Sequence, residues 1–196
     1  MGLGYIDGLA GPLEAVDPSQ LERQFATNVY GPVYTIQACL PHFRQQGSGL
    51  VINVSSIGGR LVLPFNSLYH GTKFAIEGIS EALALELAPH NIRVKIVEPG
   101  GVKTDFAGRS LEIMQKDGLT AYDTSLQQAM AVFTAPDRAG EYSEASDIAN
   151  VIYTAATDGT SQLRYIAGKD AEAMTAERAQ LSDEEYALWA IDHFKL

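Results

Sequence analysis

Two short runs of apolar, mostly β-branched residues, separated by one long amphipathic segment, constrain the fold of this chain most strongly. Residues 50–54 (Leu-Val-Ile-Asn-Val) and 92–97 (Ile-Arg-Val-Lys-Ile-Val) have the composition of buried strands. Between them, the apolar residues of 67–87 recur every three to four positions, which predicts a helix with one buried face. A strand, a helix and a second strand in this order indicate a right-handed crossover between parallel strands. The sequence therefore predicts an α/β fold built on a parallel sheet.

The segments on either side extend this pattern. Residues 1–12 are rich in glycine and predict a loop, and a helix is expected over 17–44, opened by Asp-Pro and kinked at a central Gly-Pro. A polar stretch over 103–140 predicts a loop with one or two helices. A third helix, capped by Ser143, is expected to reach about residue 157, and 163–168 predict a last short strand. Three strands are few for a doubly wound sheet.

Length and charge restrict the class of protein. The 196 residues suit one domain spanning 1–196, and 24 acidic against 14 basic residues give a net charge of −10. An acidic surface repels nucleic acid and anionic membranes, so neither is an expected partner. The single cysteine, Cys39, cannot form an intramolecular disulfide. No apolar run is long enough to span a bilayer and the N-terminus does not resemble a secretory signal, so we expect a soluble, cytoplasmic protein.

The pair Tyr69 and Lys73 is the strongest chemical signal. At positions i and i+4 of the predicted helix, the two side chains lie on one face. An ammonium group near a phenol favours the phenolate, so we expect Lys73 to lower the pKa of Tyr69 and to form an acid/base couple with it. Taken alone, the spacing is equally compatible with two solvated helix residues.

Further polar residues gather where the predicted strands end. Ser55 and Ser56 follow the first strand, and a Pro-Gly-Gly-Val-Lys-Thr turn over 99–104 follows the second. The carboxyl edge of a parallel sheet is where α/β folds bind ligands. Asn28 lies inside a predicted helix, which asparagine disfavours. Each feature also has a purely structural interpretation, as a turn residue or a surface amide.

Together these residues resemble the short-chain dehydrogenase/reductase family of the single-domain type. That family has a Tyr-x-x-x-Lys pair about thirteen residues after a strand-end serine, an asparagine in the preceding helix, and a Pro-Gly-x-x-x-Thr turn. Here these are Tyr69 and Lys73, Ser56, Asn28, and residues 99–104. The resemblance covers about residues 9–170 and implies a Rossmann-like doubly wound parallel sheet.

The resemblance also implies a function, a cofactor and residue roles. The chain would be an oxidoreductase that interconverts a hydroxyl and a carbonyl on a small alcohol or ketone, by hydride transfer with NAD or NADP. Tyr69 would exchange the proton, Lys73 would lower the pKa of the tyrosine and bind the nicotinamide ribose, Ser56 would hold the substrate oxygen, and Asn28 would position a water near Lys73. The cofactor would contact Tyr69, Lys73, Pro99, Gly100, Val102 and Thr104.

The chain departs from the family pattern at its N-terminus. The glycine-rich turn that binds the cofactor pyrophosphate is absent, so we expect a partial Rossmann-like sheet whose N-terminal strands are missing. The strand at 50–54 would then be an exposed apolar edge, which favours pairing with another chain. The family residue that selects NAD or NADP follows the second strand, so the resemblance leaves this choice open.

Two alternative functions and a substrate lid are also raised by the sequence or the resemblance. A non-catalytic remnant would act only as an oligomerisation or interaction module, through the two long helices that form a dimer interface in this family. A hydrolase using Ser56 is disfavoured, because no Gly-x-Ser-x-Gly elbow is present, and the scattered histidines argue against a metal site. Residues 105–140 correspond to the variable lid of the family. Their apolar side chains favour a hydrophobic substrate or, equally, packing onto the core: Phe106, Leu111, Ile113, Met114, Tyr122, Met130, Val132 and Phe133.

Overall fold

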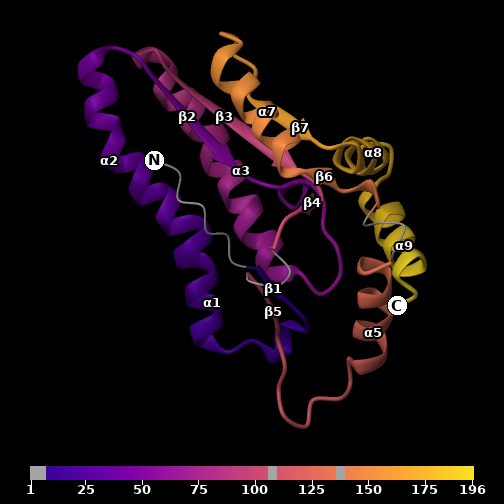
Figure 1. Cartoon of the computed structure of the whole chain (residues 1–196). Coiled ribbons are helices and arrows are strands. Elements are labelled where there is room, and N and C mark those ends of the chain that lie inside the picture. The colour runs from indigo at the N-terminus through magenta and orange to yellow at the C-terminus, as the bar shows by residue number, and fades with distance from the viewer. Residues whose placement is uncertain (1–7, 106–109, 136–139) are drawn as a thin grey trace.

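Helices cover both faces of a short parallel sheet in the computed structural model, which describes residues 8–105, 110–135 and 140–196 (Figure 1). The strands are β1 (Gly8–Ala10), β2 (Gly49–Val54), β3 (Ile92–Pro99), β4 (Val102–Lys103), β5 (Leu111–Ile113), β6 (Ser143–Glu144) and β7 (Arg164–Ala167). The helices are α1 (Pro18–Phe25), α2 (Gly31–Gln46), α3 (Ser67–Leu87), α5 (Asp123–Phe133), α7 (Ala145–Thr157), α8 (Lys169–Arg178) and α9 (Asp183–Phe194). The predicted α/β fold class is confirmed.

The main sheet has the strand order β2-β3-β7, and both of its ladders are parallel. Helix α3 connects β2 to β3, as the sequence predicts, and its bounds are those expected for the segment 67–87. The central strand β3 is buried over nearly its whole length, whereas β2 is half-buried and Val54 is 39% exposed. Among the described residues no strand pairs with the outer side of β2, which is therefore an apolar edge strand.

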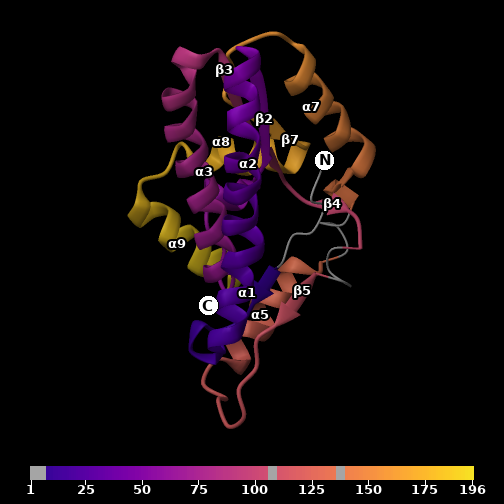
Figure 2. The ribbon, with the colours of Figure 1, turned by 90° about the vertical axis from the view of Figure 1, so that its left-hand side faces the viewer.

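The sheet lies between two helical layers, with α2 and α3 on one side and α7 on the other (Figure 2). Ile92 and Val94 pack with Leu87 of α3 and, through partly buried neighbours, with α2. Val97, one position out of phase, packs with Ile148 of α7 on the opposite face. Because successive residues of a strand point to opposite sides, the continuous apolar sequence of β3 serves both layers. No helix in the described part of the chain is long and apolar enough to cross a membrane.

The first long helix is interrupted where the sequence predicts a kink. Asp17 caps α1 and forms a capping box with Gln20. Between α1 and α2 lies one turn of π-helix, η2 (Ala26–Tyr30). Pro32 has no backbone N–H to donate to the carbonyl of residue 28, so the regular ladder cannot continue through this turn. The interruption therefore falls on Asn28.

Short parallel pairings account for the differences from the predicted elements. Residues 8–10, expected in a loop, form β1, which pairs with β5. Likewise β4 pairs with β6, so that Ser143 lies in a strand. The cap of α7 is Glu144, which forms a capping box with Asp147, one residue later than predicted. Each of these strands has two or three residues, and its partner is about 40 to 100 positions away in the sequence, so no local pattern indicates it.

Candidate active site

The turns after β2 and β3 meet at the carboxyl edge of the sheet. Val54 of β2 is aligned with Val97 of β3, so Ser55 and Ser56 come beside the end of β3. The Ser56 hydroxyl donates to the carbonyl oxygen of Pro99 at 3.4 Å, and it accepts from the backbone N–H of Gly58 at 3.0 Å. Parallel neighbouring strands thus bring the two predicted turns together.

Tyr69 lies in the first turn of α3 and reaches this edge of the sheet. A side-chain hydrogen bond joins it to Ser56. Burial raises the pKa of Tyr69 above its usual value of 10.0, and the hydrogen bond to Ser56 opposes this shift. The raised pKa is opposite to the lowering that we expected from Lys73, because desolvation of the phenolate outweighs the other influences. At neutral pH Tyr69 is therefore a phenol, able to donate a proton.

Lys73 lies one helical turn further on, with its side chain 3% exposed. Its Nζ donates to the carbonyl oxygens of Ser55 at 3.1 Å and Val54 at 3.4 Å, and lies 5.6 Å from the centre of the Tyr69 ring. Burial lowers the pKa of Lys73 to about 8, and the negative charge of Glu77 partly offsets this effect. The structure thus places Ser56, Tyr69 and Lys73 together.

Asn28 reaches the same helix from the π-helical turn η2. Its Nδ2 donates to Thr72 Oγ1 at 3.2 Å, and the Thr72 hydroxyl donates to the backbone carbonyl of Tyr69 at 2.8 Å. Asn28 is buried. The amide is therefore connected to the first turn of α3 through Thr72, and the π-helix explains how a residue that disfavours helices is accommodated there.

The turn after β3 is fixed by close packing. The backbone N–H of Gly101 donates to Asp170 Oδ2 at 2.6 Å. A Cβ at Gly100 would lie 2.4 Å from Asp170 Oδ2, and one at Gly101 would lie 2.2 Å from the Tyr142 ring. A side chain at either position would therefore have to displace Asp170 or Tyr142.

The two remaining predicted cofactor contacts begin the next segment. Val102, half-buried in β4, packs against the core beside α7, and Thr104 is exposed. The backbone N–H of Thr104 donates to the carbonyl of Val102 at 2.8 Å. Of the predicted lid, residues 106–109, which include Phe106, and 136–139 lie outside the described residues. Met114 is buried against Leu9 and Ala15, so part of the apolar content of this segment serves packing.

His70 is an important residue that the sequence analysis passed over. Leu63 donates its backbone N–H to His70 Nε2 at 2.8 Å, so Nε2 must be unprotonated and Nδ1 carries the hydrogen. His70 Nδ1 then donates to the carbonyl of Gly58 at 2.8 Å. Burial lowers the pKa of His70 from its usual 6.5, which agrees with a neutral ring. His70 thus ties α3 to the loop that carries Ser56; its partners are backbone groups, which no sequence motif reveals.

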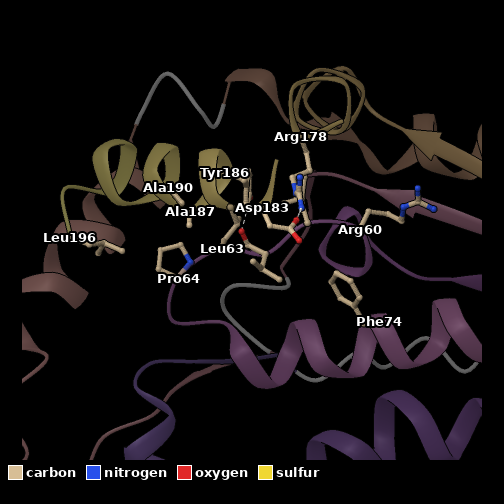
Figure 3. A pocket seen from close by; sticks show the side chains of 12 residues that line it. Arg60, Leu63, Pro64, Phe74, Arg178, Asp183, Tyr186, Ala187, Ala190 and Leu196 are labelled. Atoms are coloured by element: carbon tan, nitrogen blue, oxygen red, sulfur yellow. Dashed lines mark hydrogen bonds and ion pairs between the residues drawn. The ribbon is translucent and has the colours of Figure 1, made fainter. Parts of the chain in front are cut away.

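A cavity of about 450 Å³ lies on another side of the same loop, between residues 60–64, α3 and α9 (Figure 3). Its wall includes Leu63, Pro64 and Phe74. The Tyr186 hydroxyl donates to the carbonyl of Val62 at 2.6 Å, which fastens α9 to the loop. The cavity is mainly apolar in its lining, and Figure 3 shows Arg60 directed away from Leu63 and Pro64.

Comparison with known proteins identifies the family. The family model described as short chain dehydrogenase matches residues 4–114. The chain belongs to the short-chain dehydrogenase family. An uncharacterized oxidoreductase of Schizosaccharomyces pombe is 39% identical over 180 residues, which cover 89% of this chain and 72% of that protein. An oxidoreductase of Botryotinia fuckeliana is 33% identical, over 93% of this chain and 66% of the relative.

Solved structures of short-chain dehydrogenases have the same fold. A short-chain dehydrogenase from Streptomyces avermitilis is 29% identical with a TM-score of 0.79, over 95% of this chain and 66% of that one. NAD⁺-bound xylitol dehydrogenase is 25% identical with a TM-score of 0.65, over 85% of this chain and 66% of that one. The chain thus spans about two thirds of the length of these structures. The Rossmann-like classification is confirmed. The relatives described above are named as oxidoreductases or dehydrogenases.

Proposed function

We propose that this chain carries the hydroxyl–carbonyl chemistry of a nicotinamide-dependent oxidoreductase acting on a small alcohol or ketone. The observation that supports it most directly is the arrangement at the edge of the sheet. The Tyr69 and Ser56 hydroxyls are hydrogen-bonded to each other, and the Lys73 ammonium lies 5.6 Å from the tyrosine ring. A phenol, a hydroxyl and a buried cation on rigid elements are what proton transfer to a carbonyl oxygen requires.

The residues present fit the nicotinamide end of a dinucleotide cofactor. An ammonium group has three donors, and Lys73 directs two of them to backbone carbonyls, leaving one for a ribose hydroxyl. Tyr69 supplies a further hydroxyl, and the turn of Pro99, Gly100 and Gly101 adjoins Ser56. A similar structure, xylitol dehydrogenase, is NAD⁺-bound. The cofactor is NAD or NADP. When bound, it would supply or accept the hydride.

Because Tyr69 is a phenol at neutral pH, it can act as the proton donor in carbonyl reduction. The substrate carbonyl oxygen accepts hydrogen bonds from the Ser56 and Tyr69 hydroxyls. As the carbonyl carbon gains a hydride, the oxygen takes the Tyr69 proton, and the product is an alcohol with Tyr69 left as a phenolate. Lys73 stabilises that phenolate by its charge, and Asn28, through Thr72, holds the first turn of α3 in place.

Tyr69→Phe tests this assignment. The substitution keeps the ring and removes the proton donor, so reduction of a panel of small ketones with NADPH or NADH should fall at least about 100-fold, the usual contribution of a general acid. Tyr153→Phe, on the exposed surface of α7, is the matched control and should retain the wild-type rate. Turnover by Tyr69→Phe at the wild-type rate would refute the role of Tyr69.

We also propose that the chain forms a homo-oligomer through α2 and α3. Large apolar side chains remain exposed on these helices and on the turn before α2: Tyr30 at the end of η2, Tyr34 on α2, and Phe74 and Leu85 on α3. An apolar surface of this kind is typical of a protein interface. Sedimentation velocity of the wild type and of Leu85→Asp measures the oligomeric state of each. A shift from oligomer to monomer in Leu85→Asp is expected only if Leu85 lies in the interface.

A further inference from the structure

Two buried carboxyl groups lie beneath the candidate active site. Glu77 follows Lys73 by one turn of α3, and Glu98 is the residue of β3 that precedes the Pro99 turn; they are 5% and 2% exposed. Arg164 of β7 contacts both, with its Nε 3.1 Å from Glu77 Oε2 and 3.4 Å from Glu98 Oε1. Two acidic groups with one guanidinium between them are held where solvation is weak, so their charges must be balanced locally.

The hydrogen bonding of the pair is incomplete unless it holds a proton. The Oε1 atoms of Glu77 and Glu98 are both buried and accept no hydrogen bond. The two side chains are nevertheless within hydrogen-bonding reach of each other. Two carboxylates offer only acceptors, so a bond between them exists only when one is protonated. A shared proton therefore gives the pair a hydrogen bond that two carboxylates cannot form.

The positive charges around the pair offset its negative charge only in part. Arg164 is shared with a third carboxylate, because its Nη2 lies 2.6 Å from Glu81 Oε2. Arg60, on the loop after β2, is 3.9 Å from Glu98 and is largely solvated. Lys73, on α3, is a further positive group near Glu77, and burial lowers its pKa to about 8. Burial, followed by the charge of Glu77, raises the pKa of Glu98 to about 7.

We propose that Glu77 and Glu98 share one proton, and that the charge of this buried carboxyl–carboxylate pair controls the protonation of Lys73. The inference rests on the proposed function only for its catalytic consequence. The pair carries one negative charge when it holds the proton and two when it has lost it. The second charge favours the ammonium form of Lys73, so loss of the shared proton near neutral pH keeps Lys73 charged at higher pH. Glu77 and Glu98 are thus positioning residues that act through Lys73.

The test measures both titrations in the intact chain without cofactor or substrate. Infrared difference spectroscopy follows the carbonyl stretch of a protonated carboxyl as pH rises, and NMR follows the Lys73 side chain, assigned with Lys73→Met. Glu98→Gln and Glu77→Gln are nearly isosteric. Glu98→Gln leaves Glu77 as the one charge of the pair, and Glu77→Gln removes the charge and the hydrogen bond that add to the effect of burial on the pKa of Glu98. Glu81→Gln is the matched control, because Glu81 binds the same Arg164 from the same helix but is exposed.

In the wild type, a carboxyl group should lose its proton at about pH 7. This signal should vanish in Glu98→Gln, move to lower pH in Glu77→Gln because the charge of Glu77 is removed, and persist in Glu81→Gln. The titration midpoint of Lys73 should fall by about one pH unit in Glu98→Gln, a tenfold loss of proton affinity, and by much less in Glu81→Gln. If the wild type shows no carboxyl titrating near neutrality, or if the Lys73 midpoint is the same in Glu98→Gln, the proposal is wrong.

These readouts separate the pair from the proposed enzyme. If the chain shows the carboxyl signal and the Lys73 shift but Tyr69→Phe turns over ketones normally, the pair stands and the assignment of Tyr69 fails. If ketone reduction depends on Tyr69 but neither titration changes in Glu98→Gln, the enzyme stands and the control of Lys73 by the pair fails.

Discussion

Replacing His70 by alanine removes the connection between α3 and the loop that carries Ser56. The imidazole accepts the backbone N–H of Leu63 and donates to the carbonyl of Gly58, each at 2.8 Å. Without the ring, two backbone groups in a largely buried loop lose their partners. An unsatisfied buried group costs about 1–3 kcal/mol, so with two such groups the variant should lose roughly 2–6 kcal/mol of unfolding free energy. A typical domain has only about 5–15 kcal/mol in total.

The loss should depend on pH in a defined direction. Burial lowers the pKa of His70 below 6.5, its value in the unfolded chain. The contribution of His70 to the unfolding free energy is therefore fully present above pH 6.5 and is lost as the pH falls through the pKa of His70 in the folded chain. Urea unfolding of wild type and His70→Ala should therefore show the largest difference near pH 7.5, with the two proteins converging as the pH is lowered.

His90→Ala is the matched control, because His90 is exposed in the short turn that follows α3 and its removal should change stability by less than about 0.5 kcal/mol. Equal stability of wild type and His70→Ala at pH 7.5 would show that the two hydrogen bonds do not hold the loop. A stability difference that stays constant over this pH range would show that the neutral ring is not what matters.

Two further substitutions test the packing around the site. Gly101→Ala places a Cβ 2.2 Å from the Tyr142 ring, so it should destabilise the chain by about 1–3 kcal/mol in urea unfolding. Adding Tyr142→Ala should relieve most of that loss. If Gly101→Ala leaves the unfolding free energy unchanged, the turn is not closely packed. Tyr165→Phe removes a buried hydroxyl that donates to Asp158 at 2.5 Å and accepts from Lys95 at 2.7 Å. Hydrogen bonds to charged groups contribute about 1.5–3 kcal/mol, so a loss of that size is expected in the same assay, whereas the exposed Tyr153→Phe should have no effect.

Much of the framework is predictable because its signals are local. The periodicity of 67–87 and the β-branched composition of 50–54 and 92–97 specify α3, β2 and β3 within one or two residues. Asn28 also had a local signal, since it interrupts a helix that it disfavours. The same patterns place Ser56, Tyr69 and Lys73 at one edge of the sheet.

The parts that could not be predicted depend on contacts between distant residues. β1 forms only because Gly8–Ala10 meets residues 111–113, and His70 matters only because backbone groups at 58 and 63 face it. The shared pair of Glu77 and Glu98 joins a helix to a strand, and nothing in either segment indicates the other. The expected direction of the Tyr69 pKa was wrong for a related reason, because burial, which only the fold defines, raises this pKa more than the hydrogen bond to Ser56 lowers it.

Cofactor binding by the chain itself tests the central claim most directly. Nicotinamide fluorescence is followed while the 196-residue protein is titrated with NADPH and then with NADH. We expect saturable enhancement in the micromolar range with one of them, and a much weaker response in Lys73→Met, which removes the donor assigned to the ribose. No enhancement up to millimolar cofactor would contradict the proposal that this chain binds a nicotinamide cofactor at Tyr69 and Lys73.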